Sequence, residues 1–245
     1  MTVNNTLYSL LFSEVKFGPK GQIVLPVTLR HGDLNGDGYP DLVAVMRAAT
    51  GGSQDRVILL ENVESDGFLG RTFVPFAKQS KIFNPIVAAM FDLKEDSKLD
   101  IIATTRPGIV NTTALTKPLP IFAELNTQMF DANFIKILVA SGRCPDEECY
   151  KEGWVEQQYR VNYGTNQPGP FVQYSLLDAN GNRKRSSSGQ LSQSSHFALQ
   201  VPYMILGLGS YANYVDEIYV TVPGGSKKLK REHLIEQVVP DAQVS

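Results

Sequence analysis

One short segment of the chain carries oxygen-bearing side chains at regular positions of a tight loop. Its sequence is Asp33-Leu-Asn35-Gly-Asp37-Gly38-Tyr39-Pro-Asp41. A hard divalent cation takes six to eight oxygen ligands, and the glycine at position six allows the sharp turn that gathers them. The pattern predicts a calcium loop. The candidate metal ligands are Asp33, Asn35, Asp37, Tyr39 and Asp41.

The residues after the loop distinguish it from an EF-hand. Position twelve of an EF-hand is a bidentate glutamate that leads into a helix, whereas position twelve here is Ala44. The apolar run 41–46 is typical of a buried strand, so we expect the loop to join two strands. A metal-free Asn/Gly turn is the alternative. Three carboxylates within nine residues argue against it, since they repel one another without a cation.

The chain resembles itself at an offset of 59 residues. Pro26 falls on Pro85, and Asp33, Asp37 and Asp41 fall on Asp92, Asp96 and Asp100. The second loop, 92–100, has Lys94 in place of Asn35 and Ser97 in place of Gly38. A lysine offers no lone pair to a cation, so we expect Lys94 to neutralise the three aspartates instead. Whether the second loop binds an ion stays open.

Strand signals follow in a similar order within each period. The first period suggests strands at 24–32, 41–47, 56–62 and 72–76, and the second at 86–92, 100–105, 121–125 and 134–139. Four antiparallel strands in a repeat of this length describe a propeller blade. We therefore predict an all-β fold that contains β-propeller blades.

The first loop and its flanking strands resemble FG-GAP repeats, the calcium-loop blades of integrin α-chain propellers, and Phe17-Gly18 fits that family as well. Segments 163–170 and 189–209 are similar to the T-cell immunomodulatory protein and linkin family, and the stretch 196–224 resembles an ASPIC/UnbV-type unit. The expected parts are FG-GAP blades over 1–142, a C-terminal β-rich unit over 143–225, and a basic segment and tail over 226–245.

The resemblance implies a type I membrane glycoprotein with its repeats outside the cell. It implies a structural calcium ion, a protein ligand or cell-surface partner, and a role in cell adhesion or ligand binding. We expect extracellular or secretory-pathway localisation, with an anchor in the full-length family member. This chain has no apolar run near the roughly 20 residues that span a bilayer, and residues 1–18 do not resemble a signal sequence. We therefore expect a fragment of a longer ectodomain.

Composition is that of an ordinary globular domain, with a net charge of −2 and 42% hydrophobic residues. This balance gives no indication of nucleic-acid binding. Two basic clusters, 183–185 and 227–231, are expected to lie in solvated loops or tails. Contact of the second cluster with lipid headgroups is the alternative.

Cys144 and Cys149 are spaced as C-x4-C, which favours a small disulfide-closed loop over a zinc site, because structural zinc takes four ligands. The disulfide would fit an oxidising compartment. Sequons at Asn4 and Asn111 predict N-glycosylation there.

Catalysis finds little support, and we predict that the chain is not an enzyme. His196 follows several serines, but it begins an apolar segment and is expected to be a structural histidine. The segment 178–182 is expected to be a hairpin turn. The alternative function is a glycan-binding lectin or carbohydrate-active enzyme module, which would need two carboxylates across one cleft. The acidic candidates are Glu147, Glu148, Glu152 and Glu156.

Overall fold

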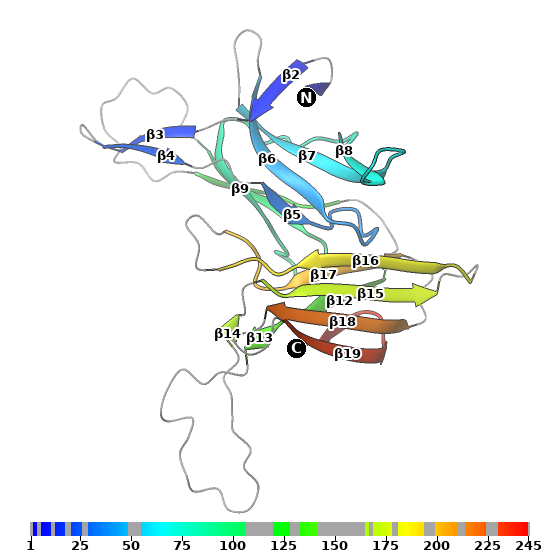
Figure 1. Ribbon diagram of the computed structural model, residues 1–245. Coiled ribbons are helices and arrows are strands. Elements are labelled where there is room, and N and C mark those ends of the chain that lie inside the picture. Colours follow the sequence, from blue (N-terminus) through cyan, green and yellow to red (C-terminus); the bar gives the residue numbers. More distant parts are fainter. Residues whose placement is uncertain are drawn as a thin grey trace, which may run out of the picture.

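The computed structural model of the 245-residue chain contains strands and no helix among the residues it describes (Figure 1). These residues are 2–3, 6–10, 13–17, 21–25, 29–48, 55–105, 120–127, 133–141, 165–166, 169–177, 181–193, 199–209, 214–223 and 230–244. The strands form antiparallel and mixed open sheets. The all-β prediction is therefore confirmed.

The first repeat forms an antiparallel meander of β5 (Arg30–Gly32), β6 (Asp41–Ala48), β7 (Asp55–Glu64) and β8 (Arg71–Pro75). All four strands lie where the sequence predicts them, although the expected strand at 24–32 is divided. Its first part belongs to β4 (Gly21–Leu25), which forms a hairpin with β3 (Ser13–Phe17). β5 pairs with the N-terminal half of β6. The C-terminal half of β6 pairs with β2 (Thr6–Leu10), which in turn pairs with β1 (Thr2–Val3).

The described residues of the second repeat form three strands, β9 (Pro85–Phe91), β10 (Asp100–Thr105) and β11 (Ile121–Glu124). The expectation that residues 134–139 supply its fourth strand is wrong. Residues 134–137 belong to β12 (Asn133–Ile137), which pairs with β17 (Met204–Gly209) and β20 (Ala242–Val244) in a different sheet. Alternating buried residues identify a strand, but they do not specify the sheet that it joins.

The two meanders pack on each other through a shared apolar core. Val43 and Val57 of the first meander and Met90 and Ile101 of the second are buried in the same cluster. The opposite faces of β6 and β7 bury a separate group, which includes Ile58. Burial on both faces explains why these strands read as continuous apolar runs, and each buried Val or Ile contributes about 1.5–3 kcal/mol.

The C-terminal region is a sandwich of two sheets. One sheet runs β16 (Arg183–Gly189), β15 (Phe171–Leu177), β18 (Val215–Pro223) and β19 (Lys230–Val238), and the other runs β17, β12 and β20. Buried side chains of both sheets share one core, in which Tyr174 is fully buried. Two short strands, β13 (Ala140–Ser141) and β14 (Thr165–Asn166), form a separate antiparallel pair.

The segment expected to be a basic tail instead contains β19 and β20. β19 pairs with β18 along its whole length, from Val215↔Val238 to Pro223↔Lys230. This segment is rich in charged residues, but Ile235 and Val238 of β19 pack against the sandwich core.

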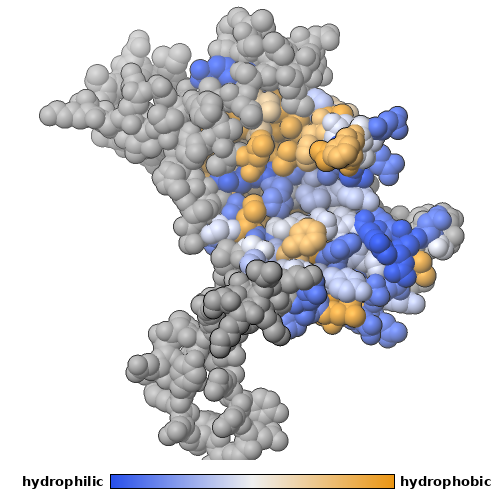
Figure 2. Space-filling view, in the orientation of Figure 1, coloured by the Kyte–Doolittle hydropathy of each residue, from blue (hydrophilic) through white to orange (hydrophobic). Residues whose placement is uncertain are grey.

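The described surface is mixed in character (Figure 2). Apolar side chains gather over the upper part of the molecule in this view, and hydrophilic ones are common around the C-terminal sandwich. Phe68 and Leu69, in the turn between β7 and β8, are almost wholly exposed. Among the described residues, no helix has the length and hydropathy needed to cross a membrane.

Candidate metal site

Asp41 holds the base of the first loop together. The loop leaves β5 and enters β6, and the pair Gly32↔Asp41 closes it. The Asp41 carboxylate is fully buried, and its two oxygens accept the N–H groups of Leu34 and Asn62, each at 2.9 Å. This side chain therefore fastens the loop to β7 as well as to its own strand.

Asp33 organises the tip of the loop. Its Oδ1 accepts the N–H groups of Gly36 (2.7 Å) and Asp37 (3.2 Å), and its Oδ2 accepts those of Gly38 (2.8 Å) and Gly207 (2.7 Å). Gly36 and Gly38 have φ angles of 71° and 91°, a left-handed conformation that glycine adopts without steric cost. These two glycines aim the amides inward at Asp33.

The other three predicted ligands line the same loop. The Asp37 carboxylate accepts the Tyr39 N–H at 2.8 Å, and Asn35 Oδ1 accepts the Asp37 N–H at 3.2 Å. Asn35 also donates to Glu61 Oε1 at 3.2 Å. The Tyr39 ring lies under the Arg71 guanidinium, 3.5 Å from it. The structure therefore brings all five predicted residues into one turn.

The two buried aspartates are electrostatically costly as anions. Burial raises the pKa of Asp33 to about 6, opposed chiefly by the Gly207 N–H and assisted by the negative charge of Asp37. Burial likewise raises the pKa of Asp41 to about 7, and its hydrogen bonds to Asn62 and Leu34 oppose that rise. A positive charge placed in the loop would relieve this cost.

The donor types fit calcium, but the donor arrangement is not that of a preformed site. An ionised carboxylate offers about four lone-pair positions, and four N–H groups already use those of Asp33. Within the described part of the chain, no three His, Cys, Asp or Glu side chains converge in the manner of a metal cluster. A cation at this loop requires Asp33 to exchange at least one N–H contact for the ion.

The second loop repeats the hydrogen bonding of the first. Asp92 accepts the N–H groups of Asp96 and Ser97, both at 3.0 Å. Asp100 accepts those of Leu93 (3.2 Å) and Asn126 (2.6 Å). The 59-residue repeat is therefore a repeat of backbone geometry as well as of sequence.

The left-handed positions also recur in the second loop. Glu95 and Ser97 have φ angles of 56° and 62°, at the places that Gly36 and Gly38 take in the first loop. L-residues pay roughly 1 kcal/mol or more for this conformation, so the hydrogen bonds of the loop must impose it.

Lys94 does not have the role that the sequence predicts. Its side chain is exposed, and no ion pair among the described residues joins it to the aspartates of its loop. Burial raises the pKa of Asp92, and the positive charge that lowers it comes from Lys136 on β12. The positive charge that acts on Asp92 thus comes from a lysine distant in sequence and not from the lysine within the loop.

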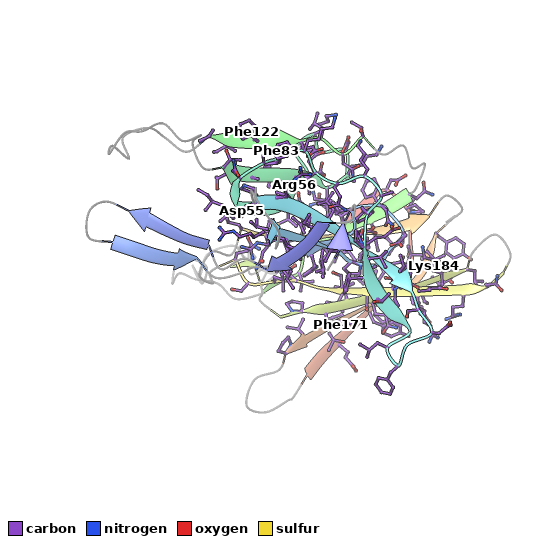
Figure 3. The ribbon with its side chains drawn as sticks, turned by 90° about the horizontal axis from the view of Figure 1, so that it is seen from above. Asp55, Arg56, Phe83, Phe122, Phe171 and Lys184 are labelled. Atoms are coloured by element: carbon purple, nitrogen blue, oxygen red, sulfur yellow. The ribbon has the colours of Figure 1, made fainter. Side chains whose placement is uncertain are left out.

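Residues of the C-terminal sandwich hydrogen-bond to the first loop, and sequence reasoning missed these contacts. The Tyr39 hydroxyl donates to the Arg185 carbonyl at 3.2 Å. Lys184 Nζ donates to the Asp37 carbonyl at 2.7 Å, the Ser186 hydroxyl donates to the Gly38 carbonyl, and the Gly207 N–H reaches Asp33. Lys184, labelled in Figure 3, lies on β16.

A sequence signal for this contact existed. Within the segment interpreted as a solvated basic cluster, Arg183 and Arg185 are exposed while Lys184 is partly buried. The period of two in a strand puts Lys184 and Ser186 on one face. The contact therefore follows from alternation, once 183–189 is recognised as a strand.

Several predicted residues lie outside the described part of the chain. They are Cys144, Cys149, Asn4, Asn111, His196, Glu147, Glu148, Glu152, Glu156 and the start of the 178–182 segment. The disulfide, the two glycosylation sites and the acidic pair that a glycosidase would need therefore stay predictions.

The fold and the loops define an all-β protein. It has two stacked repeat meanders, each with an aspartate loop, and a β-sandwich that contacts the first loop. Comparison of the C-terminal region with family models agrees with a separate unit. The model described as the C2 domain of ITFG1 matches residues 162–245. It is not described as an ASPIC/UnbV unit, and it extends beyond the expected boundary at residue 225 to include β19 and β20.

Most of the chain is similar to curated proteins named T-cell immunomodulatory protein. The mouse protein is 37% identical over 231 residues, covering 91% of this chain and 35% of the mouse protein. The macaque protein is 36% identical over 232 residues, covering 91% of this chain and 70% of that protein. Protein linkin of Caenorhabditis elegans is 24% identical over 228 residues, covering 89% of this chain and 36% of linkin.

The chain belongs to the T-cell immunomodulatory protein family. It spans about a third of the length of the mouse and human relatives. These relatives are not named as enzymes. No solved structure matches the chain.

Proposed function

We propose that this chain is a noncatalytic interaction module in which the loop at 33–41 binds calcium as a structural ion. The observation that carries the proposal is the burial of Asp33 and Asp41 beside the further charge of Asp37, with pKa values of about 6 and about 7 for the buried pair. Bound calcium would supply the positive charge that these carboxylates lack. The loop connects β5 to β6, and it hydrogen-bonds to β7 through Asp41 and to β17 through Asp33. Ordering of the loop would therefore stiffen the contacts among these strands.

We further propose that the two meanders are FG-GAP blades of a β-propeller. Support comes from the hairpin order of β5 to β8, the shared core of the two meanders, and the recurrence of the loop geometry at the offset of 59 residues. The mouse and human relatives are about three times as long as this chain, which leaves room for further blades.

The proposed biological role is cell adhesion or ligand binding by the extracellular or luminal part of a membrane-anchored glycoprotein. The support is family membership together with the exposed apolar side chains of the meanders. The proposed partner is a protein ligand or a cell-surface protein. Immobilised protein should retain beads or cells in calcium and release them when a chelator is added.

Calcium binding is tested by calorimetry and by thermal unfolding. An ion that binds only the folded state at 100 times its Kd stabilises it by about 2.7 kcal/mol, which corresponds to roughly 5–10 °C in a domain of this size. Asp37→Asn should abolish most of this gain while keeping the acceptor for the Tyr39 N–H. Asp96→Asn, at the matching position of the second loop, is the control. No calcium-dependent rise in Tm in the unmodified chain would refute the metal site.

A further inference from the structure

The contact between the first loop and the C-terminal sandwich depends on two glycines. A Cβ atom at Gly207 would overlap the backbone of Gly36, and one at Gly38 would overlap the Tyr174 hydroxyl and the Gly207 carbonyl. The Tyr174 hydroxyl in turn donates to the Gly207 carbonyl at 2.7 Å. The backbones of the loop and of β17 are therefore in direct contact, and a side chain at either glycine would force them apart.

The sandwich also brings a positive charge to the loop. Lys184 Nζ donates to the Asp37 carbonyl at 2.7 Å and feels the charges of both Asp37 and Asp33. Its neighbour Arg183 faces away and pairs with Glu217 at 3.6 Å. Lys184 thus places beside the aspartates of the first loop the positive charge that Lys94 was predicted to supply to those of the second.

We infer that Lys184 is a tethered counter-cation of the first loop, which docks the sandwich there together with Ser186 and Gly207, and that calcium and Lys184 share the same negative charge. The docking part rests on the contacts alone, and the calcium part rests on the proposed function. Because Gly207 donates to Asp33 Oδ2, an ion that binds Asp33 acts on the same atom that the sandwich uses.

The charge is tested with Lys184→Met and with Arg183→Met as the matched control. Removing a nearby positive charge should tighten calcium binding about fivefold by calorimetry, since two cations close together repel. Arg183→Met should leave the affinity within about twofold, because Arg183 faces Glu217. Unchanged or weaker calcium binding by Lys184→Met would overturn the inference of a shared charge.

Docking is tested without calcium, by hydrogen exchange at the amides of Gly36, Asp37 and Gly38. Gly207→Ala forces the loop away from β17, so these amides should exchange at least about tenfold faster. Gly189→Ala is the control, since a Cβ there meets the Pro170 carbonyl at an ordinary 3.7 Å. Equal protection in the Gly207→Ala and Gly189→Ala variants would overturn the docking role.

A milder variant keeps the test decisive if Gly207→Ala does not fold. Ser186→Ala removes the hydroxyl that donates to the Gly38 carbonyl and should accelerate exchange at the loop in the same direction. Unchanged exchange in this variant would count against docking. If the unmodified chain binds no calcium but the exchange results hold, the proposed calcium site fails while the docking inference stands.

Discussion

The two aspartate loops share a backbone design but differ in what packs against them. In both, the first aspartate caps the amides of the turn, and the last one accepts an N–H group from beyond the loop, that of Asn62 on β7 or of Asn126 just after β11. The tip of the first loop is partly covered by the sandwich, whereas residues 93–96 of the second are exposed. Sequence repetition therefore reproduced the hydrogen bonds, and the neighbouring sheet set the electrostatic environment.

The second loop also shows how much a glycine matters in each setting. Gly38 needs both a positive φ and the absence of a side chain, because Tyr174 and Gly207 lie against it. Ser97 has a positive φ as well, yet it carries a side chain, which lies near Phe134 and Gly207 of the sandwich. The same turn can thus carry a side chain at this position where the packing around it leaves room for one.

The largest expected effect comes from removing the carboxylate that closes each loop. Asp41→Ala leaves the buried N–H groups of Leu34 and Asn62 without their acceptor, and should lower the free energy of unfolding by about 2–4 kcal/mol. Asp100→Ala should cost a similar amount. Urea unfolding measures both. A cost for Asp100→Ala below a third of that for Asp41→Ala would show that the two networks are not equivalent.

Substitutions at the matching positions 38 and 97 should change stability in opposite directions in the two loops. Gly38→Ala should destabilise the chain by about 1–3 kcal/mol, because it adds steric overlap to a strained φ. Ser97→Gly should raise stability by up to about 1 kcal/mol, since it relieves a positive φ at a partly exposed position. Thermal unfolding of the two variants checks these signs, and destabilisation by Ser97→Gly would contradict the account of strain.

The pH dependence should distinguish the buried carboxylates of the first loop. Their folded-state pKa values, about 6 for Asp33 and about 7 for Asp41, lie above the ordinary 3.8. In calcium-free buffer the folded state therefore binds more protons than the unfolded state between pH 4 and 7. The contribution of these two carboxyl groups to stability is full below about pH 4. It should fall as the pH rises through that window, by about 1.4 kcal/mol for each unit by which a pKa is raised.

The measurement is the urea midpoint at pH 4.5, 6 and 7.5. Asp41→Asn should flatten the fall, because it removes one of the two raised carboxylates. Stabilisation by calcium should increase over the same range, since the ion competes with protons for these oxygens. An equal slope in Asp41→Asn and in the unmodified chain would contradict the assignment.

The smallest expected effect is that of Lys94. Because its side chain is exposed and joins no described ion pair, Lys94→Met should change stability by less than about 0.5 kcal/mol. Lys136→Met is the comparison, since the charge of Lys136 lowers the pKa of Asp92 and its ammonium lies 4.0 Å from the Tyr203 ring. A larger loss from Lys94→Met than from Lys136→Met would restore the sequence prediction.

Sequence alone determined the local features of the first repeat. The spacing from Asp33 to Asp41 identifies a tight loop, and alternating or continuous apolar runs identify the four strands around it. These features depend on neighbours along the chain, through turn geometry and strand periodicity. The offset of 59 residues extended the prediction to the second loop, whereas the left-handed backbone at Glu95 and Ser97 emerged only from the structure.

Tertiary structure decided which sheets the strands join and which residues surround each loop. β12 follows the second meander in sequence but joins the sandwich, because Ile135 and Ile137 complete its core. Lys184 reaches the first loop across 147 residues, while Lys94 faces solvent within its own loop. The sign and position of a charge are written in the sequence, but its effect depends on distance and burial, which only packing sets.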